Sequence, residues 1–312
     1  RFKPIVKLLI MTTFSLTIKE ILSTSSTAQN SLPLPLVDPI KVEGNVNRKH
    51  LYHEIQNFNI TSDVNGFDTS EQTHSFLEFE IGIDEVGRGP LYGSVVISGA
   101  ILPNKWSALI EHNPLQDTPL SVLTDSKKLS ELKRESLYEP IKQQAIAYAT
   151  VEIPAAVIDD VNILQATMLG MRVAGEQLMI HTFNAIQYSL KNATMPAISF
   201  KLLIDGNKLP DLDWQLLQRH GIGNYSGSTC LVNREAWVKG DARHTAIAAA
   251  SVLAKVSRDR QIISDSVIYP GYGLESHKGY PTKAHIEAIQ KLGVLPQHRR
   301  SFKPVKLALM II

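Results

Sequence analysis

The strongest constraint on the fold is a short apolar run at residues 200–204 that ends on Asp205. A continuous run of this length is typical of a parallel strand covered by helices on both faces. Two further β-rich runs, at 79–83 and 93–102, are separated by a glycine-rich turn and predict a hairpin. Strands followed by alternating strands and helices favour a mixed sheet flanked by helices. The chain is therefore expected to be an α/β protein.

The remaining elements follow the same pattern. A strand is expected at 146–153, and a weaker one at 235–238. The spacing of apolar residues predicts helices over 130–144, 158–178 and 242–264. The last of these is apolar almost all round in its first half, so we expect it to be buried.

Residues 1–76 differ in composition from the rest of the chain. The segment 23–36 is rich in Ser, Thr and Pro, and polar sequence continues to His74. Such sequence buries too little apolar surface to offset the entropy that is lost on ordering. We expect a mostly disordered extension over 1–76, with a short helix near 14–22, followed by one folded domain over 77–312.

The charge and the cysteine content of the chain limit the kinds of partner and the cellular compartment that are expected. The 312 residues carry 32 Lys and Arg against 30 Asp and Glu, so the net charge of +2 favours neither acidic nor basic partners. The single cysteine, Cys230, cannot form an intrachain disulfide, which suits a reducing compartment and predicts a cytoplasmic location. No stretch approaches the roughly 18 consecutive apolar residues that span a bilayer.

One region is locally basic. Residues 277–312 carry seven Lys and Arg against Glu287 alone. The basic residues are Lys278, Lys283, Lys291, Arg299, Arg300, Lys303 and Lys306. A basic patch on an otherwise balanced chain is the footprint expected of a nucleic-acid partner.

Four acidic residues stand where strands end or where a strand meets a helix: Asp84, Glu85, Asp205 and Asp241. In open α/β sheets ligands bind at the carboxyl ends of strands, so these acids could converge there. Two carboxylates about 4 Å apart repel by roughly 4 kcal/mol at an effective dielectric of 20, so converging acids need protons or a hard cation. Carboxylate ligands favour Mg²⁺ or Mn²⁺. Taken singly, each acid also fits a turn, a helix cap or a solvated surface.

Three short segments suit contacts with phosphate, sugar or base. The turn at 87–89 follows the acid pair, and its glycines would let backbone amides approach a phosphate or sugar, although a plain hairpin turn needs the same residues. Tyr280 lies beside basic residues, which suits stacking or a simple Tyr-Pro turn. The lysines at 127–128 stand near a predicted helix start, where they would contact phosphates or form a solvated cap. The candidate recognition residues are Gly87, Arg88, Gly89, Lys127, Lys128 and Tyr280.

The motifs occur in a fixed order along the chain: IGIDEVGRGP at 81–90, DSKKL at 125–129, LIDGN at 203–207, KGD at 239–241, IAAASVLAKV at 247–256, HKGYPT at 277–282 and HRRSF at 298–302. Their order and their spread over about 79–306 resemble bacterial ribonuclease HII, of the type 2 ribonuclease H family. The resemblance implies an RNase H-like fold with a five-stranded mixed sheet and a helical C-terminal part. It also implies endonucleolytic cleavage of the RNA strand of RNA-DNA hybrids, and cleavage 5′ of single ribonucleotides embedded in duplex DNA.

The resemblance also assigns roles to residues. The four acids fall on the family's catalytic and metal site, and the turn 87–89 and Tyr280 fall on its junction-recognition elements. Two divalent ions, Mn²⁺ or Mg²⁺, would then activate a water and stabilise the leaving 3′-oxygen, giving 5′-phosphate and 3′-hydroxyl ends. The implied partners are RNA-DNA hybrids and ribonucleotide-containing DNA, bound by a monomer that does not associate with membranes.

Departures from the family pattern leave two alternatives. The extension 1–76, a longer loop at 104–121 and an insert at 209–233 are expected to be surface elaborations. One alternative is a hybrid-binding module without activity, although binding alone has no need of four clustered carboxylates facing a polyanion. The other is the sister enzyme ribonuclease HIII, which carries a folded N-terminal substrate-binding domain, whereas residues 1–76 are polar and of low complexity.

Overall fold

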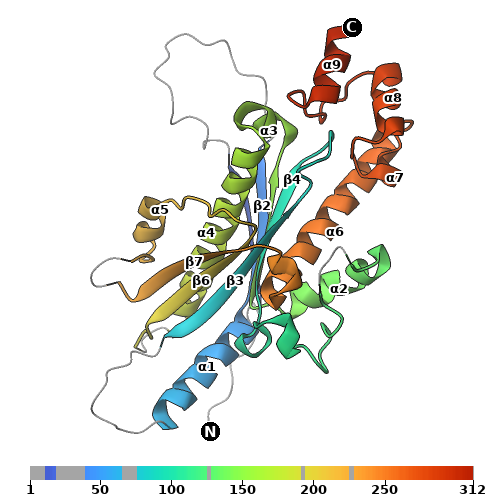
Figure 1. Cartoon of the computed structure of the whole chain (residues 1–312). Coiled ribbons are helices and arrows are strands. Elements are labelled where there is room, and N and C mark those ends of the chain that lie inside the picture. The colour runs from blue at the N-terminus through green and yellow to red at the C-terminus, as the bar shows by residue number, and fades with distance from the viewer. Residues whose placement is uncertain are drawn as a thin grey trace, which may run out of the picture.

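The computed structural model describes residues 11–18, 39–64, 76–124, 128–190, 194–224 and 228–311. A seven-stranded mixed sheet in the order β1-β2-β5-β4-β3-β6-β7 forms its centre (Figure 1). The strands are β1 (Met11–Ile18), β2 (Ile40–Asn47), β3 (Leu77–Val86), β4 (Val95–Ile101), β5 (Ala147–Ile153), β6 (Ile198–Asp205) and β7 (Cys230–Trp237). The helices are α1 (Arg48–Val64), α2 (Glu131–Gln144), α3 (Ala155–Val161), α4 (Ile163–Leu190), α5 (Trp214–Arg219), α6 (Thr245–Ile268), α7 (Leu274–His277), α8 (Lys283–Leu292) and α9 (Lys303–Ile311). Short 3-10 turns are η1 (Asn104–Trp106), η2 (Ile110–His112) and η3 (Gly240–Ala242).

The strand pairing confirms the α/β class and the expected hairpin. β3 pairs antiparallel with β4, and β4 with β5, whereas β3 and β6 are parallel, as are β6 and β7. In the parallel register Ile83 lies opposite Ile204, and Asp205 lies opposite Trp237. The carboxyl ends of β3, β6 and β7 therefore meet at one edge of the sheet.

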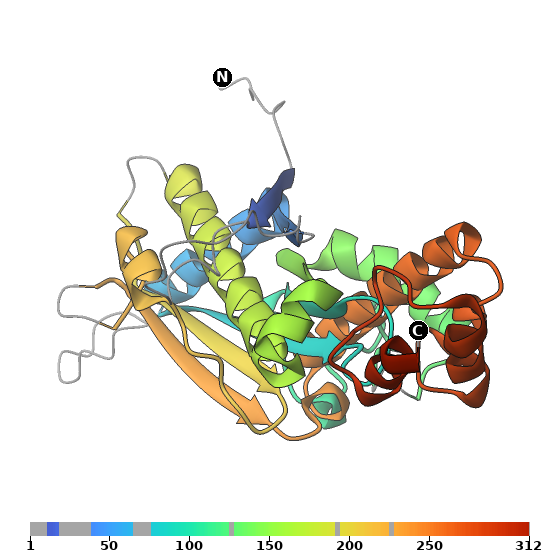
Figure 2. The same cartoon turned by 90° about the horizontal axis from the view of Figure 1, so that it is seen from above.

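Two long helices cover the two faces of the sheet, α4 on one and α6 on the other (Figures 1 and 2). A Cβ atom at Gly99 would lie 2.5 Å from Cδ1 of Leu178, so α4 packs directly on the backbone of β4. On the other face, a Cβ atom at Gly82 would lie 2.1 Å from the carbonyl carbon of Ala246. The start of α6 is buried, as its apolar sequence predicts. Close packing at Gly82 brings the segment that precedes α6 near the end of β3.

The expected count of five strands is wrong, because β1 and β2 come from the segment assigned to the extension. β2 pairs antiparallel with β5, with Val42 opposite Val151. Alternation of apolar and charged residues from Ile40 explains the pairing, because it gives β2 one apolar face that is buried in the core. α1 follows and buries Leu51 and Ile55.

The short helix expected near 14–22 is also wrong, because β1 occupies residues 11–18. Phe14 stacks on His181 of α4 with ring centroids 3.8 Å apart, and a Cβ atom at Gly44 would clash with the Phe14 ring. Packing on a neighbouring helix and strand thus outweighs the weak local preference. The other residues before 76 lie outside the described part of the chain.

Two expected boundaries shift. β7 begins at Cys230, and α5 precedes it, so the insert at 209–233 contains regular structure. The helix expected over 158–178 is two helices, because Asn162 adopts a positive φ of 70° between α3 and α4. α4 then continues to Leu190.

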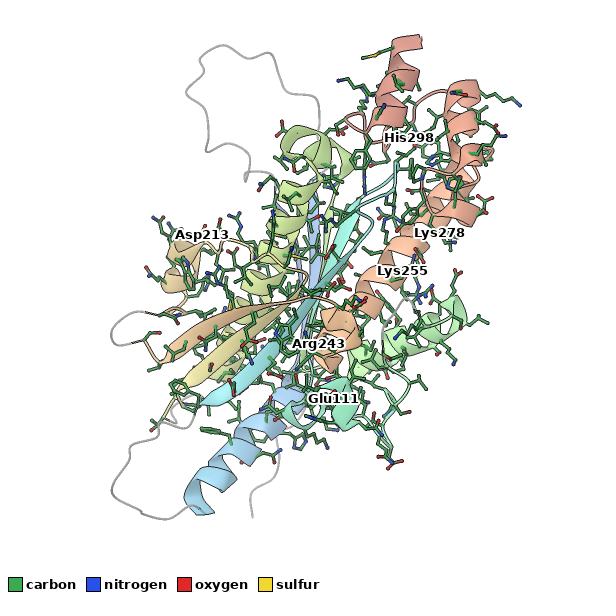
Figure 3. The ribbon with its side chains drawn as sticks, in the orientation of Figure 1. Glu111, Asp213, Arg243, Lys255, Lys278 and His298 are labelled. Atoms are coloured by element: carbon green, nitrogen blue, oxygen red, sulfur yellow. The ribbon has the colours of Figure 1, made fainter. Side chains whose placement is uncertain are left out.

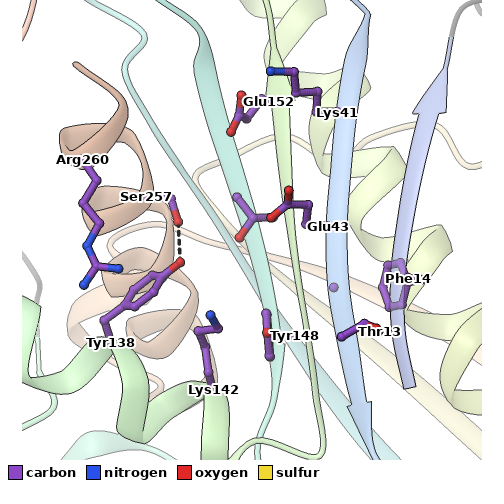
Figure 4. Close-up of a pocket in the computed structure, with 12 residues that line it drawn as sticks. Thr13, Phe14, Lys41, Glu43, Tyr138, Lys142, Tyr148, Glu152, Ser257 and Arg260 are labelled. Atoms are coloured by element: carbon purple, nitrogen blue, oxygen red, sulfur yellow. Dashed lines mark hydrogen bonds between the residues drawn. The ribbon is translucent and has the colours of Figure 1, made fainter. Parts of the chain in front are cut away.

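A hollow of about 530 Å³ lies beside β2 and β5, next to α2 and α6 (Figure 4). On the side of α2 and α6, Tyr138 and Ser257 share a 3.1 Å hydrogen bond. The Lys142 ammonium lies 5.0 Å from the ring centroid of Tyr138 and 5.5 Å from that of Tyr148. The lining carries charges of both signs and none of the predicted site residues.

The environment of Cys230 and the character of the helices relate to what the cysteine content and the apolar runs of the sequence predict. Cys230 is buried, and burial raises the pKa of its thiol to about 12, so the thiol stays protonated at neutral pH. Among the helices that the structure describes, none has the length and apolar character needed to cross a membrane.

Candidate active site

Three of the four predicted acids meet at the carboxyl edge of the sheet. Asp84 and Glu85 lie near the end of β3, and Asp205 ends β6. Each offers a carboxylate oxygen, and these oxygens all lie within 4.8 Å of one another. Parallel pairing of β3 and β6 explains the meeting, because it brings equivalent strand ends side by side.

The cluster concentrates negative charge at a site where Asp84 is buried and Glu85 and Asp205 are half-buried. Burial raises the pKa of Asp84 well above its usual range, and the charges of Glu85 and Asp205 raise it further. Burial also raises the pKa of Glu85, although the Arg88 guanidinium 3.2 Å from its Oε1 acts in the opposite direction. Ser251 of α6 forms a side-chain hydrogen bond with Asp84, which favours its charged form.

The donor set fits a hard divalent cation. All three ligands are carboxylates, the type that Mg²⁺ and Mn²⁺ prefer. Glu85 Oε2 is buried and has no hydrogen-bond partner within the described structure. A cation among the acids would satisfy this oxygen and offset the repulsion that raises the pKa values.

Asp241 lies outside the group of three. It is buried in η3, just before α6. Its loop is tied to the acid site, because the Gly240 amide donates to Oδ1 of Asp205 over 2.7 Å. The structure therefore brings together three of the four acids and places the fourth on the adjoining loop.

The turn at 87–89 and Tyr280 form one surface next to Glu85. A Cβ atom at Gly89 would lie 3.6 Å from Cε1 of Tyr280. The Leu91 amide donates to the Gly279 carbonyl over 2.8 Å, which joins the two segments. Tyr280 is 40% exposed, so its ring can meet a ligand.

Two buried histidines, His285 and His298, and the half-buried His277 support the loop of Tyr280. The Leu295 amide donates to Nδ1 of His298, which leaves the proton of His298 on Nε2. That proton bridges to Nε2 of His285 at 3.1 Å, and His285 Nδ1 donates to the Tyr280 carbonyl at 3.0 Å. His277 stacks on His285 with centroids 4.3 Å apart. Figure 3 marks His298 and Lys278 in this C-terminal region.

His285 and His298 are neutral at pH 7. Burial lowers the pKa of His285 to about 4, and burial together with His285 lowers the pKa of His298 to about 3. A neutral imidazole has one donor and one acceptor nitrogen, which is what this series of hydrogen bonds requires.

Lys128 lies shortly before the start of α2, whereas Lys127 lies outside the described residues. Lys128 is exposed, and the N-cap of α2 is Ser130. Lys278 Nζ lies 3.9 Å from Oε1 of Glu131 in the first turn of α2. The start of α2 is therefore close to the loop that carries Tyr280.

One member of the predicted basic footprint is misplaced. Arg299 is fully buried, and its guanidinium donates to main-chain carbonyls of the segment 87–93. Arg299 therefore does not contribute to the basic surface that the sequence predicts. Sequence cannot separate a buried arginine from an exposed one, because both occur among polar neighbours.

A hollow of about 240 Å³ lies beside the acids, and some of the residues that line it were not predicted from the sequence. Its walls include Glu85, Arg88 and Asp205. The other lining residues are Leu164, Thr167, Met168 and Met171 of α4, and Gly206, Asn207 and Lys208 after β6. The α4 residues read as one face of a core helix and gave no signal. Ser251 did carry one, because it is the single hydroxyl in an alanine-rich helical run.

Comparison with known proteins gives consistent matches. A family model described as Ribonuclease HII matches residues 81–305. A Ribonuclease HII from Psychrobacter sp. (strain PRwf-1) is 56% identical over 300 aligned residues, covering 91% of this chain and 92% of the relative. A Ribonuclease HII from Psychrobacter arcticus is 48% identical over 277 residues, covering 88% and 89%. The crystal structure of the ribonuclease H2 from Pyrococcus horikoshii OT3 is similar at 25% identity and a TM-score of 0.47, covering 75% and 98%.

The match to the relative from Psychrobacter sp. (strain PRwf-1) reaches into the N-terminal segment. Residues 77–312 alone cannot account for 91% of the chain, so the alignment includes part of 1–76. The additional N-terminal sequence thus has a counterpart in a Psychrobacter relative.

Proposed function

The chain belongs to the ribonuclease HII family, and we propose that its gathered acids are the centre at which the chemistry of that family takes place. As a member, the protein is a ribonuclease H, an endonuclease that acts on RNA-DNA hybrids and leaves 5′-phosphate products. The observation that carries the proposal is the meeting of Asp84, Glu85 and Asp205 within 4.8 Å, with one buried oxygen left without a partner.

We assign these three residues, together with Asp241 on the adjoining loop, as the groups that hold two divalent ions, Mn²⁺ or Mg²⁺. When bound, such ions supply a nucleophilic water at neutral pH and stabilise the leaving 3′-oxygen. The chain's own part is to hold carboxylates in fixed positions. Ser251 orients Asp84, and the Gly240 amide orients Asp205.

Recognition is assigned to the surface beside Glu85. The amides of the turn 87–89 would read the 2′-hydroxyl that distinguishes RNA from DNA. Tyr280 would stack on the deoxyribose that follows a ribonucleotide, which supports cleavage 5′ of single ribonucleotides in duplex DNA. Arg88, Lys127 and Lys128 would contact phosphates. The short distance between Gly89 and Tyr280 supports a shared binding surface.

Neither alternative is favoured. A silent binding module has no need for three acids gathered within 4.8 Å, and relatives across most of the chain are ribonucleases HII. For ribonuclease HIII, a separate N-terminal substrate-binding domain would be expected, whereas β2 joins the central sheet through β5. We therefore place the catalytic unit at 77–312, with residues 39–64 packed onto it, in a monomer of the cytoplasm.

The test is cleavage-site mapping on a DNA duplex that contains one ribonucleotide. With Mn²⁺ or Mg²⁺ we expect a single nick 5′ of the ribonucleotide, with a 5′-phosphate on the ribonucleotide and a 3′-hydroxyl on the DNA. With a chelator, or with the all-DNA duplex, no nick is expected. Binding without nicking would support the silent module, and cleavage confined to long RNA tracts would refute the junction assignment.

A further inference from the structure

Two buried arginines bind nearly every carbonyl of the segment 87–94. The Arg299 side chain donates to the carbonyls of Gly87, Arg88, Pro90 and Gly93 over 2.6–2.9 Å, and its amide donates to the Leu91 carbonyl. The Arg258 side chain donates to the carbonyls of Tyr92, Ser94 and Lys278 over 3.0–3.1 Å. Within 87–94 only the Gly89 carbonyl has no bond to either residue.

Both guanidiniums are buried cations without a carboxylate partner. Each arginine is 0% exposed, and neither forms an ion pair with any residue that the structure describes. Burial lowers the pKa of both side chains, that of Arg299 to about 9, which leaves it charged at neutral pH. A buried charge is costly unless hydrogen bonds satisfy it. The hydrogen bonds to the carbonyls therefore stabilise the two guanidiniums in their buried positions.

This arrangement fixes where the amides of the turn point. In a trans peptide the carbonyl of one residue and the amide of the next point in opposite directions. Since the carbonyls of Gly87 and Arg88 face Arg299, the amides of Arg88 and Gly89 face away from it. Neither amide donates to another group in the described part of the chain. They are therefore free to meet a ligand, and a Cβ atom at Gly89 would lie 3.6 Å from Cε1 of Tyr280, so Tyr280 lies next to this turn.

We propose that Arg299, assisted by Arg258, is a positioning residue that presents the Arg88 and Gly89 amides to the 2′-hydroxyl and the adjacent phosphate of the ribonucleotide. The inference rests on the proposed function and adds the groups that hold the reading surface in place. Arg258 contributes to the same arrangement, because its hydrogen bond to the Lys278 carbonyl connects the loop of Tyr280 to the turn. Charged donors on the carbonyls also polarise the amides and strengthen their outward hydrogen bonds.

The planar fork of arginine is essential to this role. Nη1 of Arg299 reaches two carbonyls, and Nη2 and Nε reach one each. A lysine keeps the positive charge, but its single ammonium cannot reach four carbonyls laid out for a planar group. Arg299→Lys therefore removes the geometry without removing the charge.

The experiment measures the dissociation constants of two duplexes, in a chelator so that no cleavage occurs. The duplexes are identical except for one 2′-hydroxyl. Wild-type protein should prefer the ribonucleotide-containing duplex. Arg299→Lys should lose about tenfold of that preference, while its affinity for the all-DNA duplex stays within about twofold of wild type. A folded Arg299→Lys that keeps the wild-type preference overturns the proposal.

The matched control is Arg234→Lys. Arg234 donates to the Pro210 carbonyl over 2.8 Å, the same chemistry in another part of the fold. It should retain the preference even if its melting temperature falls. If it loses the preference as Arg299→Lys does, the effect is one of general stability and the positioning role is wrong.

Two further outcomes are decisive. If wild-type protein shows no preference but nicks the single-ribonucleotide duplex, amide reading fails while the catalytic assignment stands. If Arg299→Lys does not fold, amide hydrogen exchange in the wild type decides. The Arg88 and Gly89 amides should become protected by the ribonucleotide-containing duplex and not by the all-DNA duplex, and equal exchange in both overturns the proposal.

Discussion

The Gly240 amide donates a 2.7 Å hydrogen bond to Oδ1 of Asp205. The Asp205 carboxylate therefore has two roles. It belongs to the acid cluster, and it fixes the loop that carries Asp241. Replacement of Asp205 therefore separates the two roles if the new side chain keeps the acceptor and loses the charge.

Asp205→Asn should abolish metal-dependent cleavage and leave the fold intact. The amide oxygen can still accept from Gly240, but the charge that cations need is gone. We expect a loss of roughly a thousandfold or more in turnover, with Mn²⁺ or Mg²⁺ at saturation. Asp211→Asn, at an exposed position, is the control and should be active. Near wild-type turnover of Asp205→Asn would remove Asp205 from the ligand set.

Tyr280→Ala should weaken junction recognition. Loss of a stacking contact of about 1–3 kcal/mol lowers cleavage roughly ten- to a hundredfold. The loss should be larger for a single embedded ribonucleotide than for a long RNA tract, where the following deoxyribose is absent at most sites. Tyr280→Phe keeps the ring and should retain the selectivity. An unchanged ratio of the two rates in Tyr280→Ala would falsify the junction role.

The neutral histidine pair predicts destabilisation by acid. The pKa is about 6.5 in the unfolded chain but about 4 for His285 and about 3 for His298 in the fold. Between these values the unfolded state binds more protons, so the free energy of unfolding falls as the pH falls. From pH 6 to pH 5 the loss should be about 1 kcal/mol per histidine.

Urea denaturation at the two pH values measures this effect. His298→Gln should show about half of the pair's extra loss, because one of the two groups no longer titrates. His112→Gln, at an exposed site, should behave as wild type. Equal pH dependence in His298→Gln and wild type would show that His298 is not buried in its neutral form.

Leu51→Ala tests whether α1 belongs to the folded unit. Leu51 is fully buried in the main core, and its truncation should lower the free energy of unfolding by about 2–5 kcal/mol. Turnover of the folded fraction should not change, because α1 packs on α4, β1 and β2, and none of these elements carries a site acid. Tyr52→Ala is the neighbouring control, since Tyr52 is 51% exposed and should cost little stability. Equal stability of the two variants would show that the N-terminal elements do not pack on the sheet.

Sequence alone was sufficient for the features set by local pattern. The run at 200–204 and its terminal Asp205 predicted a buried strand ending on an acid, and β6 confirms the strand. The apolar run at 79–83 likewise predicts that Asp84 and Glu85 stand at the end of the first strand of the hairpin, and β3 confirms this. Such features depend on residues that are adjacent in the chain, so periodicity and composition are enough to find them.

Tertiary structure decided what depends on distant partners. β2 pairs with β5, which lies about a hundred residues further along the chain. The residues around β2 are polar in sequence, so composition alone did not predict the apolar face that this pairing buries. The local pattern of basic residues predicts a surface position for Arg299, whereas in the fold the carbonyls of residues 87–93 surround its side chain. Burial of a charge is fixed by the acceptors that the fold gathers around it, and those acceptors are backbone groups that every sequence carries.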